Sequence, residues 1–293
     1  MKPGGPFAAL LAEGRLHLQH GPIDLVIEAW GERAEVAAAY RQAIARFGDI
    51  LEVLVQELPL LRSPLGDALP LLRGPVARRM LTACWPHRAS YITPMAAVAG
   101  SVADEILEAM LRDRVLAKAY VNNGGDIALH LASGAALSLG VVNQLDNPAI
   151  DATVVLSAAL PVRGLATSGW RGRSQSLGIA DAVTVFARDA ASADAAATMV
   201  ANAVNAEHPA IARAPARALR ADSDLGDLPV TTAVAALPAA ARAHALDAGW
   251  ARARALQQRG LIFAAYLALQ GDARALPAMQ ALPGEAPGRH AAG

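Results

Sequence analysis

Apolar and polar residues alternate from Arg15 to Trp30, and a Gly-Pro pair interrupts this pattern near its middle. An alternation of period two predicts strands with one buried face, and Gly-Pro predicts a turn. We therefore expect a β-hairpin here. From Glu32 to Glu57 the apolar residues recur at helical spacing until Pro59 and Pro64, which predicts one long helix.

The next part of the chain has a weaker pattern. Leu58–Arg79 is rich in Pro and Leu without a clear period, so we expect an irregular connector. Thr93–Val115 again has helical spacing, with Thr93 as the expected N-cap and Pro94 at the first helical position. The small residues of 96–103 would allow another backbone or a flat ligand to pack closely against this helix.

The remaining pattern predicts a mixture of strands and helices. The expected elements are a strand, Gly-Gly turn and strand over Ala119–Leu131; further strands of the same sheet at Leu137–Val142 and Ala152–Leu156; a loop over Val162–Arg173; a strand from Ala180; a helix over Ser192–Asn205; a strand over Leu228–Ala235; a helix over Pro238–Arg259; and a closing strand in GLIFAAYLALQG. Strict β–α–β alternation is missing, which favours the α+β class with a mixed or antiparallel sheet. We expect one large domain, residues 1–275, followed by a disordered tail, residues 276–293.

Composition narrows the function classes. The 293 residues are 54% hydrophobic, and 26 Lys+Arg balance 26 Asp+Glu, so a general nucleic-acid binder is not expected. No apolar run is long enough to span a membrane and no export signal is evident, which favours the cytoplasm. Cys84 is the only cysteine, which excludes an intrachain disulfide. It is expected to be a buried packing thiol, the alternative being a catalytic thiolate beside His87.

The most informative polar residues are Asp194 and Thr198, four apart in ADAAATMVANAV. This spacing places both oxygens on one helix face, and hard oxygen ligands suit Mg²⁺. The alternative is a solvated Asp beside a Thr whose hydroxyl is satisfied by the helix. Two Gly-containing segments upstream, VNNGGDI and GLATSG, favour the first interpretation because their backbone amides could approach a phosphate-bearing ligand.

Four motifs together resemble the ApbE-like superfamily. They are PMAAVAGSVAD (Pro94–Asp104), VNNGGDI (Val121–Ile127), LATSGWRGRS (Leu165–Ser174) and VTVFARDAASADAAATMVANAV (Val183–Val204). The founding members are FAD:protein FMN transferases, which use Mg²⁺ to cut FAD at its pyrophosphate and attach FMN to a Thr of a target flavoprotein. The chain is most similar to an uncharacterised branch, so the resemblance implies an ApbE-like fold and a flavin (FAD or FMN) or other phosphate-bearing ligand.

The resemblance also implies roles for individual residues. Asp194 and Thr198 would hold Mg²⁺, with a main-chain carbonyl near Ala99 and Gly100 as a third ligand. The residues expected to line the ligand pocket are Gly124, Gly125, Asp126, Thr167, Ser168 and Gly169, with Arg171 and Arg173 beside them for phosphate recognition. The alternatives are an ordinary Gly-Gly turn capped by Asp126 and solvated loop arginines.

Departures from the transferase pattern leave the reaction open. Gln175 stands where the transferases have a His, and Pro-x-Thr-Gly is missing. A glutamine cannot act as a base. The competing hypothesis is a noncatalytic scaffold or assembly protein of a metabolic pathway, with sulfur assimilation as an association of this branch. A homodimer is the expected oligomer in either case. The seven histidines form no HxxxH or HExxH pair, so a zinc hydrolase is not expected.

Overall fold

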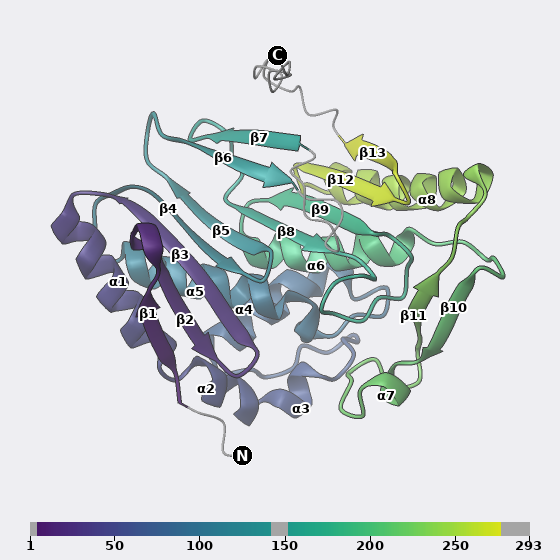
Figure 1. The fold of residues 1–293 in the computed structure, drawn as a ribbon. Coiled ribbons are helices and arrows are strands. Elements are labelled where there is room, and N and C mark those ends of the chain that lie inside the picture. The colour runs from purple at the N-terminus through teal and green to yellow at the C-terminus, as the bar shows by residue number, and fades with distance from the viewer. Residues whose placement is uncertain (1–4, 142–151, 277–293) are drawn as a thin grey trace, which may run out of the picture.

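A nine-stranded antiparallel sheet forms the centre of the molecule (Figure 1). The structure is a computed structural model that describes residues 5–141 and 152–276. The sheet strands, in spatial order, are β1 (Phe7–Leu10), β2 (Leu16–His20), β3 (Ile23–Gly31), β4 (Leu116–Asn123), β5 (Asp126–Leu131), β8 (Gly164–Ser168), β9 (Ala182–Ala187), β12 (Ala264–Leu269) and β13 (Asp272–Leu276). Two separate hairpins are β6 (Ala136–Val141) with β7 (Ala152–Ser157), and β10 (Ile211–Pro215) with β11 (Pro229–Val234).

The helices complete the α+β class predicted from the sequence. They are α1 (Arg33–Phe47), α2 (Ile50–Gln56), α3 (Leu58–Leu61), α4 (Pro75–Cys84), α5 (Val98–Leu111), α6 (Ala190–Ala203), α7 (Ala216–Leu219) and α8 (Ala239–Gln258), with short 3₁₀ turns η1 (Ala12–Gly14), η2 (Trp85–His87) and η3 (Pro94–Ala97). Within residues 5–141 and 152–276, no helix has the length and apolar character that crossing a membrane requires.

Local pattern correctly predicted the elements with strong periodicity. The expected hairpin is β2–β3, and its turn contains Gly21 at φ +56°. The expected Gly-Gly hairpin is β4–β5, where Gly124 and Gly125 have φ +66° and +112°. Both turns require the left-handed backbone region, which glycine enters without steric cost.

The single long helix expected over 32–57 is wrong. Helix α1 ends at Phe47 and α2 begins at Ile50, with Asp49 in a non-helical conformation between them. Apolar spacing continues across the break because Phe47 and Ile50 are both buried in the same core. The connector expected over 58–79 is partly helical, because it contains α3 and the beginning of α4, where Pro75 takes the first position.

The loop expected over 162–173 is also wrong, because it contains β8, an interior strand of the main sheet. Its glycine-rich composition reflects close packing instead of loop structure. A Cβ on Gly164 would lie 2.0 Å from the backbone carbon of Asp189, so only glycine lets the strand approach the start of α6. The sequence also did not predict β1, β10 or β13 as strands.

Strands β6 and β7 exist, but they form their own sheet and do not extend the main one as expected. Leu137 and Leu156 pack with Leu129, Leu165 and Phe186 in a separate apolar cluster over the main sheet. Residue 142, the last of the expected strand, lies outside the described residues. The predicted tail, 276–293, does so too apart from Leu276, which ends β13.

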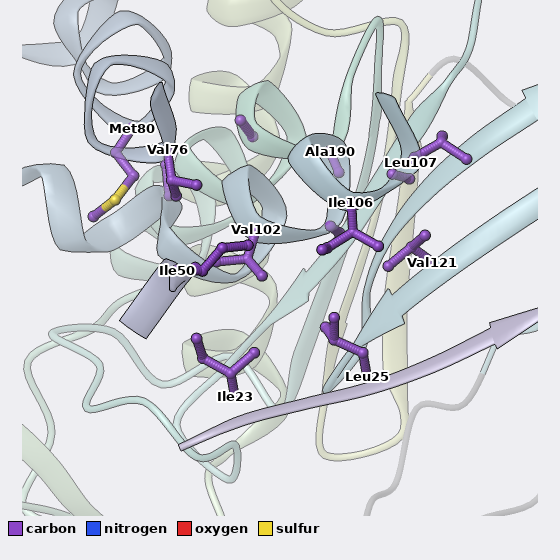
Figure 2. Close-up of a cluster of buried hydrophobic side chains, with 14 of the residues drawn as sticks. Ile23, Leu25, Ile50, Val76, Met80, Val102, Ile106, Leu107, Val121 and Ala190 are labelled. Carbon is purple, nitrogen blue, oxygen red and sulfur yellow. The ribbon is translucent and has the colours of Figure 1, made fainter. Parts of the chain in front are cut away.

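The largest apolar core lies between the sheet and helices α4 and α5 (Figure 2). Ile23, Leu25 and Val121 project from the sheet toward Val102 and Ile106 of α5. All five are buried, which makes this contact a large favourable term in folding. Packing of the apolar face of α5 against the sheet therefore fixes the distance between the first turn of α5 and the sheet.

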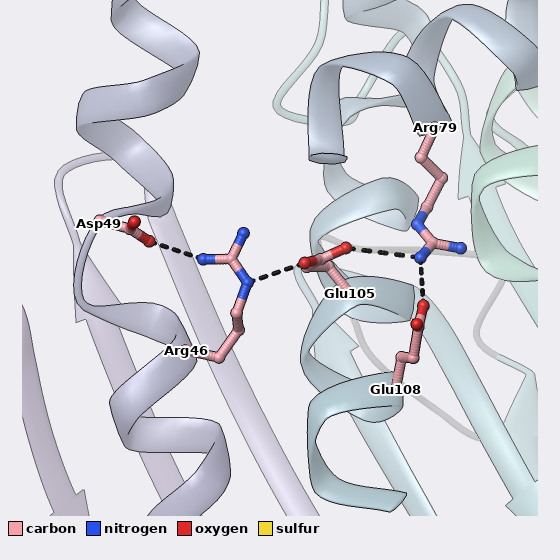
Figure 3. A network of polar contacts seen from close by, with 5 residues as sticks. All are labelled: Arg46, Asp49, Arg79, Glu105 and Glu108. Atoms are coloured by element: carbon pink, nitrogen blue, oxygen red, sulfur yellow. Dashed lines mark hydrogen bonds and ion pairs between the residues drawn. The ribbon is translucent and has the colours of Figure 1, made fainter. Parts of the chain in front are cut away.

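A chain of ion pairs holds α5 from its other side (Figure 3). Glu105 of α5 accepts from Arg46 Nε of α1 at 2.7 Å and from Arg79 Nη2 of α4 at 3.4 Å. Arg79 also pairs with Glu108 at 2.7 Å. Because Glu105 is only 12% exposed, these charge-assisted contacts are less screened than ordinary surface pairs and fix α5 between two neighbouring helices.

Candidate functional site

Helices α5 and α6 cap each other through one aspartate apiece. The Asp104 carboxylate of α5 accepts from the backbone N–H groups of Ala190 and Ala191 at 3.0 and 2.9 Å. The Asp194 carboxylate of α6 accepts from Gly100 N–H at 3.0 Å, at the start of α5. Each aspartate thus satisfies first-turn N–H groups that a helix cannot satisfy itself.

Small residues make this mutual capping possible. A Cβ on Gly100 would lie 2.3 Å from the carbonyl oxygen of Ala190, so the two helix starts are in backbone contact. Each aspartate follows the small residue of its own helix by four positions, Gly100 before Asp104 and Ala190 before Asp194. The expected N-cap, Thr93, does not cap α5; its hydroxyl donates to Asp224 Oδ2 at 2.5 Å, and α5 begins after η3.

Strand alternation brings more polar residues to the helix-facing side of the sheet. Ala128 and Val121 belong to the core beneath α5, so Asp126 and Asn123 share that face. Asn123 Nδ2 donates to the Ala99 carbonyl at 3.1 Å, which ties the β4–β5 turn to the first turn of α5. Asn123 was not singled out from the sequence, although it lies within the VNNGGDI motif.

Asp126 and Asp194 form a pair of interacting carboxylates. Burial, followed by the charge of Asp194, raises the pKa of Asp126 well above its usual range, and the backbone N–H of Thr167 opposes this rise. Burial also raises the pKa of Asp194 to about 7, against the N–H groups of Gly100 and Ala99. Oδ1 of Asp126 is buried and has no hydrogen-bond partner within residues 5–141 and 152–276. Two like charges and an unsatisfied oxygen are unfavourable without a compensating proton or cation.

The metal ligands implied by the resemblance therefore lie partly together. Asp194 and the backbone of Ala99 are adjacent, and Asp126 joins them from the sheet. Thr198 lies one turn further along α6 and is half-buried. Among the described residues, no three His, Cys, Asp or Glu side chains are grouped for a metal. Two carboxylates supplemented by carbonyl and hydroxyl oxygens would form a donor set that suits Mg²⁺ and not Zn²⁺.

The Gly-Gly turn has a guanidinium beside it. A Cβ on Gly124 would lie 3.4 Å from Arg173 Nη1, and Arg173 Nη2 donates to the Pro22 carbonyl at 3.3 Å. Gly124 is exposed, while Asn122 Oδ1 accepts from Gly125 N–H at 2.9 Å and closes the turn. The structure therefore places Arg173 beside the turn formed by Gly124 and Gly125, although the turn and the arginine belong to separate sequence motifs.

The other residues expected at the pocket have mainly structural contacts. The Thr167 and Thr184 hydroxyls hydrogen-bond at 2.9 Å across β8 and β9. Thr167 therefore contacts Asp126 through its backbone N–H and not through its hydroxyl. Arg171 donates to Asp181 Oδ1 at 2.9 Å and stacks over Trp170. A Cβ on Gly169 would lie 2.4 Å from the Asp181 carbonyl oxygen. Ser168 is half-buried at the end of β8, on the helix-facing side by alternation with Thr167.

Gln175 stands where the transferases have a His, and both ends of its side-chain amide are hydrogen-bonded to other segments of the chain. Its Nε2 donates to the Ala216 carbonyl at 3.0 Å, and its Oε1 accepts from Ser223 Oγ at 2.5 Å. Tyr91 OH donates to the Asp224 carbonyl at 2.7 Å in the same region. The segment 216–228 is therefore held against the loops that precede α5 and follow β8.

Cys84 is buried, as expected, and its thiol donates to the Pro94 carbonyl at 3.7 Å. Burial and the charge of Asp194 raise its pKa well above the usual range. The thiolate is thus disfavoured, which argues against the nucleophile alternative. The surface hollows in the described part of the chain include one of about 440 Å³ beside Asp104 and Asp189, and another of about 450 Å³ beside α2 and α3. Asp126 and Asp194 line neither.

Comparison with known proteins gives a consistent family relation. A family model described as "AbpE bacteria" matches residues 8–275. A UPF0280 protein of Methanothrix thermoacetophila is 37% identical over 188 residues, which cover 63% of this chain and 75% of that protein. A UPF0280 protein of Archaeoglobus fulgidus is 37% identical over 134 residues, and the match spans 45% of this chain and about half, 51%, of that relative's length.

Among solved structures, the apo form of the Pseudomonas stutzeri flavinyl transferase ApbE aligns with 71% of this chain and 87% of its own chain. The sequence identity is 11% and the TM-score is 0.35.

Proposed function

Because the chain belongs to the family described as "AbpE bacteria" and to the UPF0280 proteins, we propose that it binds a phosphate-bearing small molecule with Mg²⁺ at Asp126 and Asp194. The family relation supports a flavin-related function at the family level, so FAD and FMN are the first ligands to test. Mg²⁺, the identity of the ligand and any transfer reaction belong to the proposal.

The observation that carries this proposal is the pair of carboxylates with one unsatisfied oxygen. The charge of Asp194 raises the cost of ionising Asp126, and Oδ1 of Asp126 has no hydrogen-bond partner among the described residues. A divalent cation would remove both penalties, since hard oxygen ligands and negative charge are what Mg²⁺ prefers. Asp126, Asp194 and Thr198 would hold it, with the Ala99 carbonyl nearby. When bound, the ion would neutralise phosphate charge.

The ligand's phosphate would be recognised from the sheet side of the same region. Arg173 stands next to the exposed Gly124, so a guanidinium and a side-chain-free turn face the solvent together. Arginine binds phosphate in a bidentate manner, and glycine permits close approach to the backbone. Arg171 is less suited to this role because Asp181 already engages it.

The first experiment titrates FAD, FMN and ADP into the protein by calorimetry, with Mg²⁺ and with EDTA. Wild type is compared with Asp194→Asn, which keeps an acceptor for Gly100 N–H and loses the charge. Asp247→Asn on the surface of α8 is the matched control, because its carboxylate is 66% exposed and remote in sequence from the site. Mg²⁺-dependent binding lost only in Asp194→Asn supports the proposal; the same Mg²⁺ dependence in both variants refutes it.

Thermal unfolding separates a metal role for Asp194 from its capping role. In EDTA, Asp194→Asn is expected to unfold at the same or a higher temperature than wild type, because it removes repulsion with Asp126 while the hydrogen bond remains. In Mg²⁺, only wild type is expected to gain stability. If neither protein responds to Mg²⁺ and neither binds a nucleotide, the noncatalytic scaffold becomes the better hypothesis.

Flavinyl or phosphoryl transfer is the reaction class to assay once binding is established. Gln175 has no acid–base function and both ends of its amide are engaged by Ser223 and Ala216. Hydrolysis of FAD to FMN and AMP in Mg²⁺ is therefore the simplest readout, and loss of that activity in Asp194→Asn would place the reaction at this site.

A further inference from the structure

A second cluster of polar groups lies where the end of α8 meets η2. Arg252 lies on α8, and Arg259, seven residues later, directly follows Gln258, the last residue of that helix. Arg259 Nη2 donates to the Pro86 carbonyl at 2.7 Å, so the end of α8 is joined to the residue before His87. Arg88 follows His87 and stacks over the Trp85 ring at 4.4 Å.

The arginines of this cluster have no acidic partner within residues 5–141 and 152–276. No carboxylate there lies within 4.0 Å of Arg88, Arg252 or Arg259. Arg252 is half-buried, and burial together with the charge of Arg259 lowers its pKa. Packing of the aliphatic part of an arginine against apolar residues explains why its methylene groups are buried. It does not explain why two guanidinium groups lie near each other without an acidic partner.

His87 is the buried part of the cluster. The side chain is 3% exposed and its Nδ1 has no hydrogen-bond partner among the described residues. Burial lowers the pKa of His87 to about 4, and the charges of Arg252 and Arg259 add to this effect. Within the described part of the chain, this buried ring nitrogen has no hydrogen-bond partner and the two guanidinium groups have no acidic partner. A bound oxyanion would supply both the negative charge and the acceptor oxygens that these groups lack.

From this cluster we infer that Arg252, Arg259 and His87 form a binding site for a phosphate-type dianion, either inorganic phosphate or a phosphate monoester. The site is separate from the Asp126–Asp194 pair and uses no metal. Two guanidinium groups would balance the negative charge, and the imidazole would add a third donor in the neutral tautomer that carries its proton on Nδ1. Arg88 extends the positive surface at the exposed side.

The test measures inorganic phosphate and glycerol 3-phosphate binding to the full chain by calorimetry in EDTA, at constant ionic strength and pH 7. Saturable one-to-one binding of either is expected for wild type. The double variant Arg252→Gln, Arg259→Gln is expected to bind at least tenfold more weakly. Arg254→Gln is the control for loss of a positive charge from α8, where Arg254 is exposed and stacks over Trp250. Its affinity should stay within twofold of wild type.

Nuclear magnetic resonance of protein that contains isotope-labelled histidine provides a second readout. Bound phosphate should shift the His87 ring resonances in wild type and not in the double variant. If the double variant does not fold, Arg259→Gln replaces it, since that side chain is exposed; at least a fivefold loss is then expected.

The proposal is overturned if neither anion binds wild type saturably, or if the arginine variants bind as wild type does. Asp194→Asn should retain phosphate binding in EDTA. Loss of binding in that variant would assign the anion to the other site and would also overturn the proposal.

Discussion

The buried histidine makes a quantitative prediction about stability against pH. His87 is 3% exposed, and burial, with Arg252 and Arg259 adding to it, lowers its pKa from 6.5 to about 4. In the unfolded chain this imidazole titrates near 6.5. Between these values the unfolded state binds more protons than the folded state. The contribution to stability is therefore complete above about pH 6.5 and is lost as the pH falls toward 4.

The magnitude follows from the separation of the two pKa values. About 2.5 pH units at about 1.4 kcal/mol per unit correspond to about 3 kcal/mol when the titration is complete. At pH 5 the same linkage predicts a loss of about 2 kcal/mol relative to pH 7.5. That is a sizeable fraction of the 5–15 kcal/mol of free energy that stabilises a typical domain.

The assay is urea unfolding of wild type and His87→Asn at pH 7.5 and pH 5, in phosphate-free buffers, because a bound oxyanion would raise the pKa of His87. Other groups, including the buried aspartates, titrate equally in both proteins, so the difference between their pH dependences isolates His87. His244→Asn is the matched control, since His244 is exposed on α8. Wild type should lose about 2 kcal/mol more than His87→Asn between the two pH values. Equal losses within about 0.5 kcal/mol would refute the reasoning.

Two further predictions concern packing and the segment beside the site. Gly100→Ala should destabilise the protein by about 1–3 kcal/mol in urea, because its Cβ would lie 2.3 Å from the Ala190 carbonyl oxygen, whereas Gly66→Ala, with nothing within 4 Å, should change stability by less than about 0.5 kcal/mol. Equal effects would mean that α5 and α6 separate easily. Gln175→Ala should speed limited proteolysis within 216–228, because it removes the hydrogen bonds to Ser223 and Ala216; an unchanged cleavage rate would show that the segment is held by other contacts.

Strong periodicity predicted the elements that depend on nearby residues. The β2–β3 and β4–β5 hairpins follow from alternation and from glycines that must adopt positive φ. Helix α8 was expected over 238–259 and spans Ala239–Gln258. Asp194 was identified on its helix face, and it does lie beside the first turn of α5 next to Ala99. These features depend on local backbone preference and on residues within a few positions of each other.

Elements with weak local preference were predicted poorly. Gly164 and its small neighbours resemble a loop in the sequence, yet β8 is an interior strand because its glycine meets the start of α6. The break between α1 and α2 at Asp49 was hidden because both helices bury the same side. Tertiary packing overrides local propensity in both cases.

The sequence by itself determined the α+β class, the hairpins and the helix that carries Asp194 and Thr198, because each of these depends on short-range pattern. Only the tertiary structure placed Asp126 beside Asp194, let Asp104 and Asp194 cap each other's helices, and gathered His87 with Arg252 and Arg259. Asp126 and Asp194 are 68 positions apart, Asp104 and Asp194 are 90 apart, and His87 precedes Arg252 and Arg259 by 165 and 172 positions. Their proximity follows from strand order and from how closely two helix starts can approach, which a local pattern does not specify.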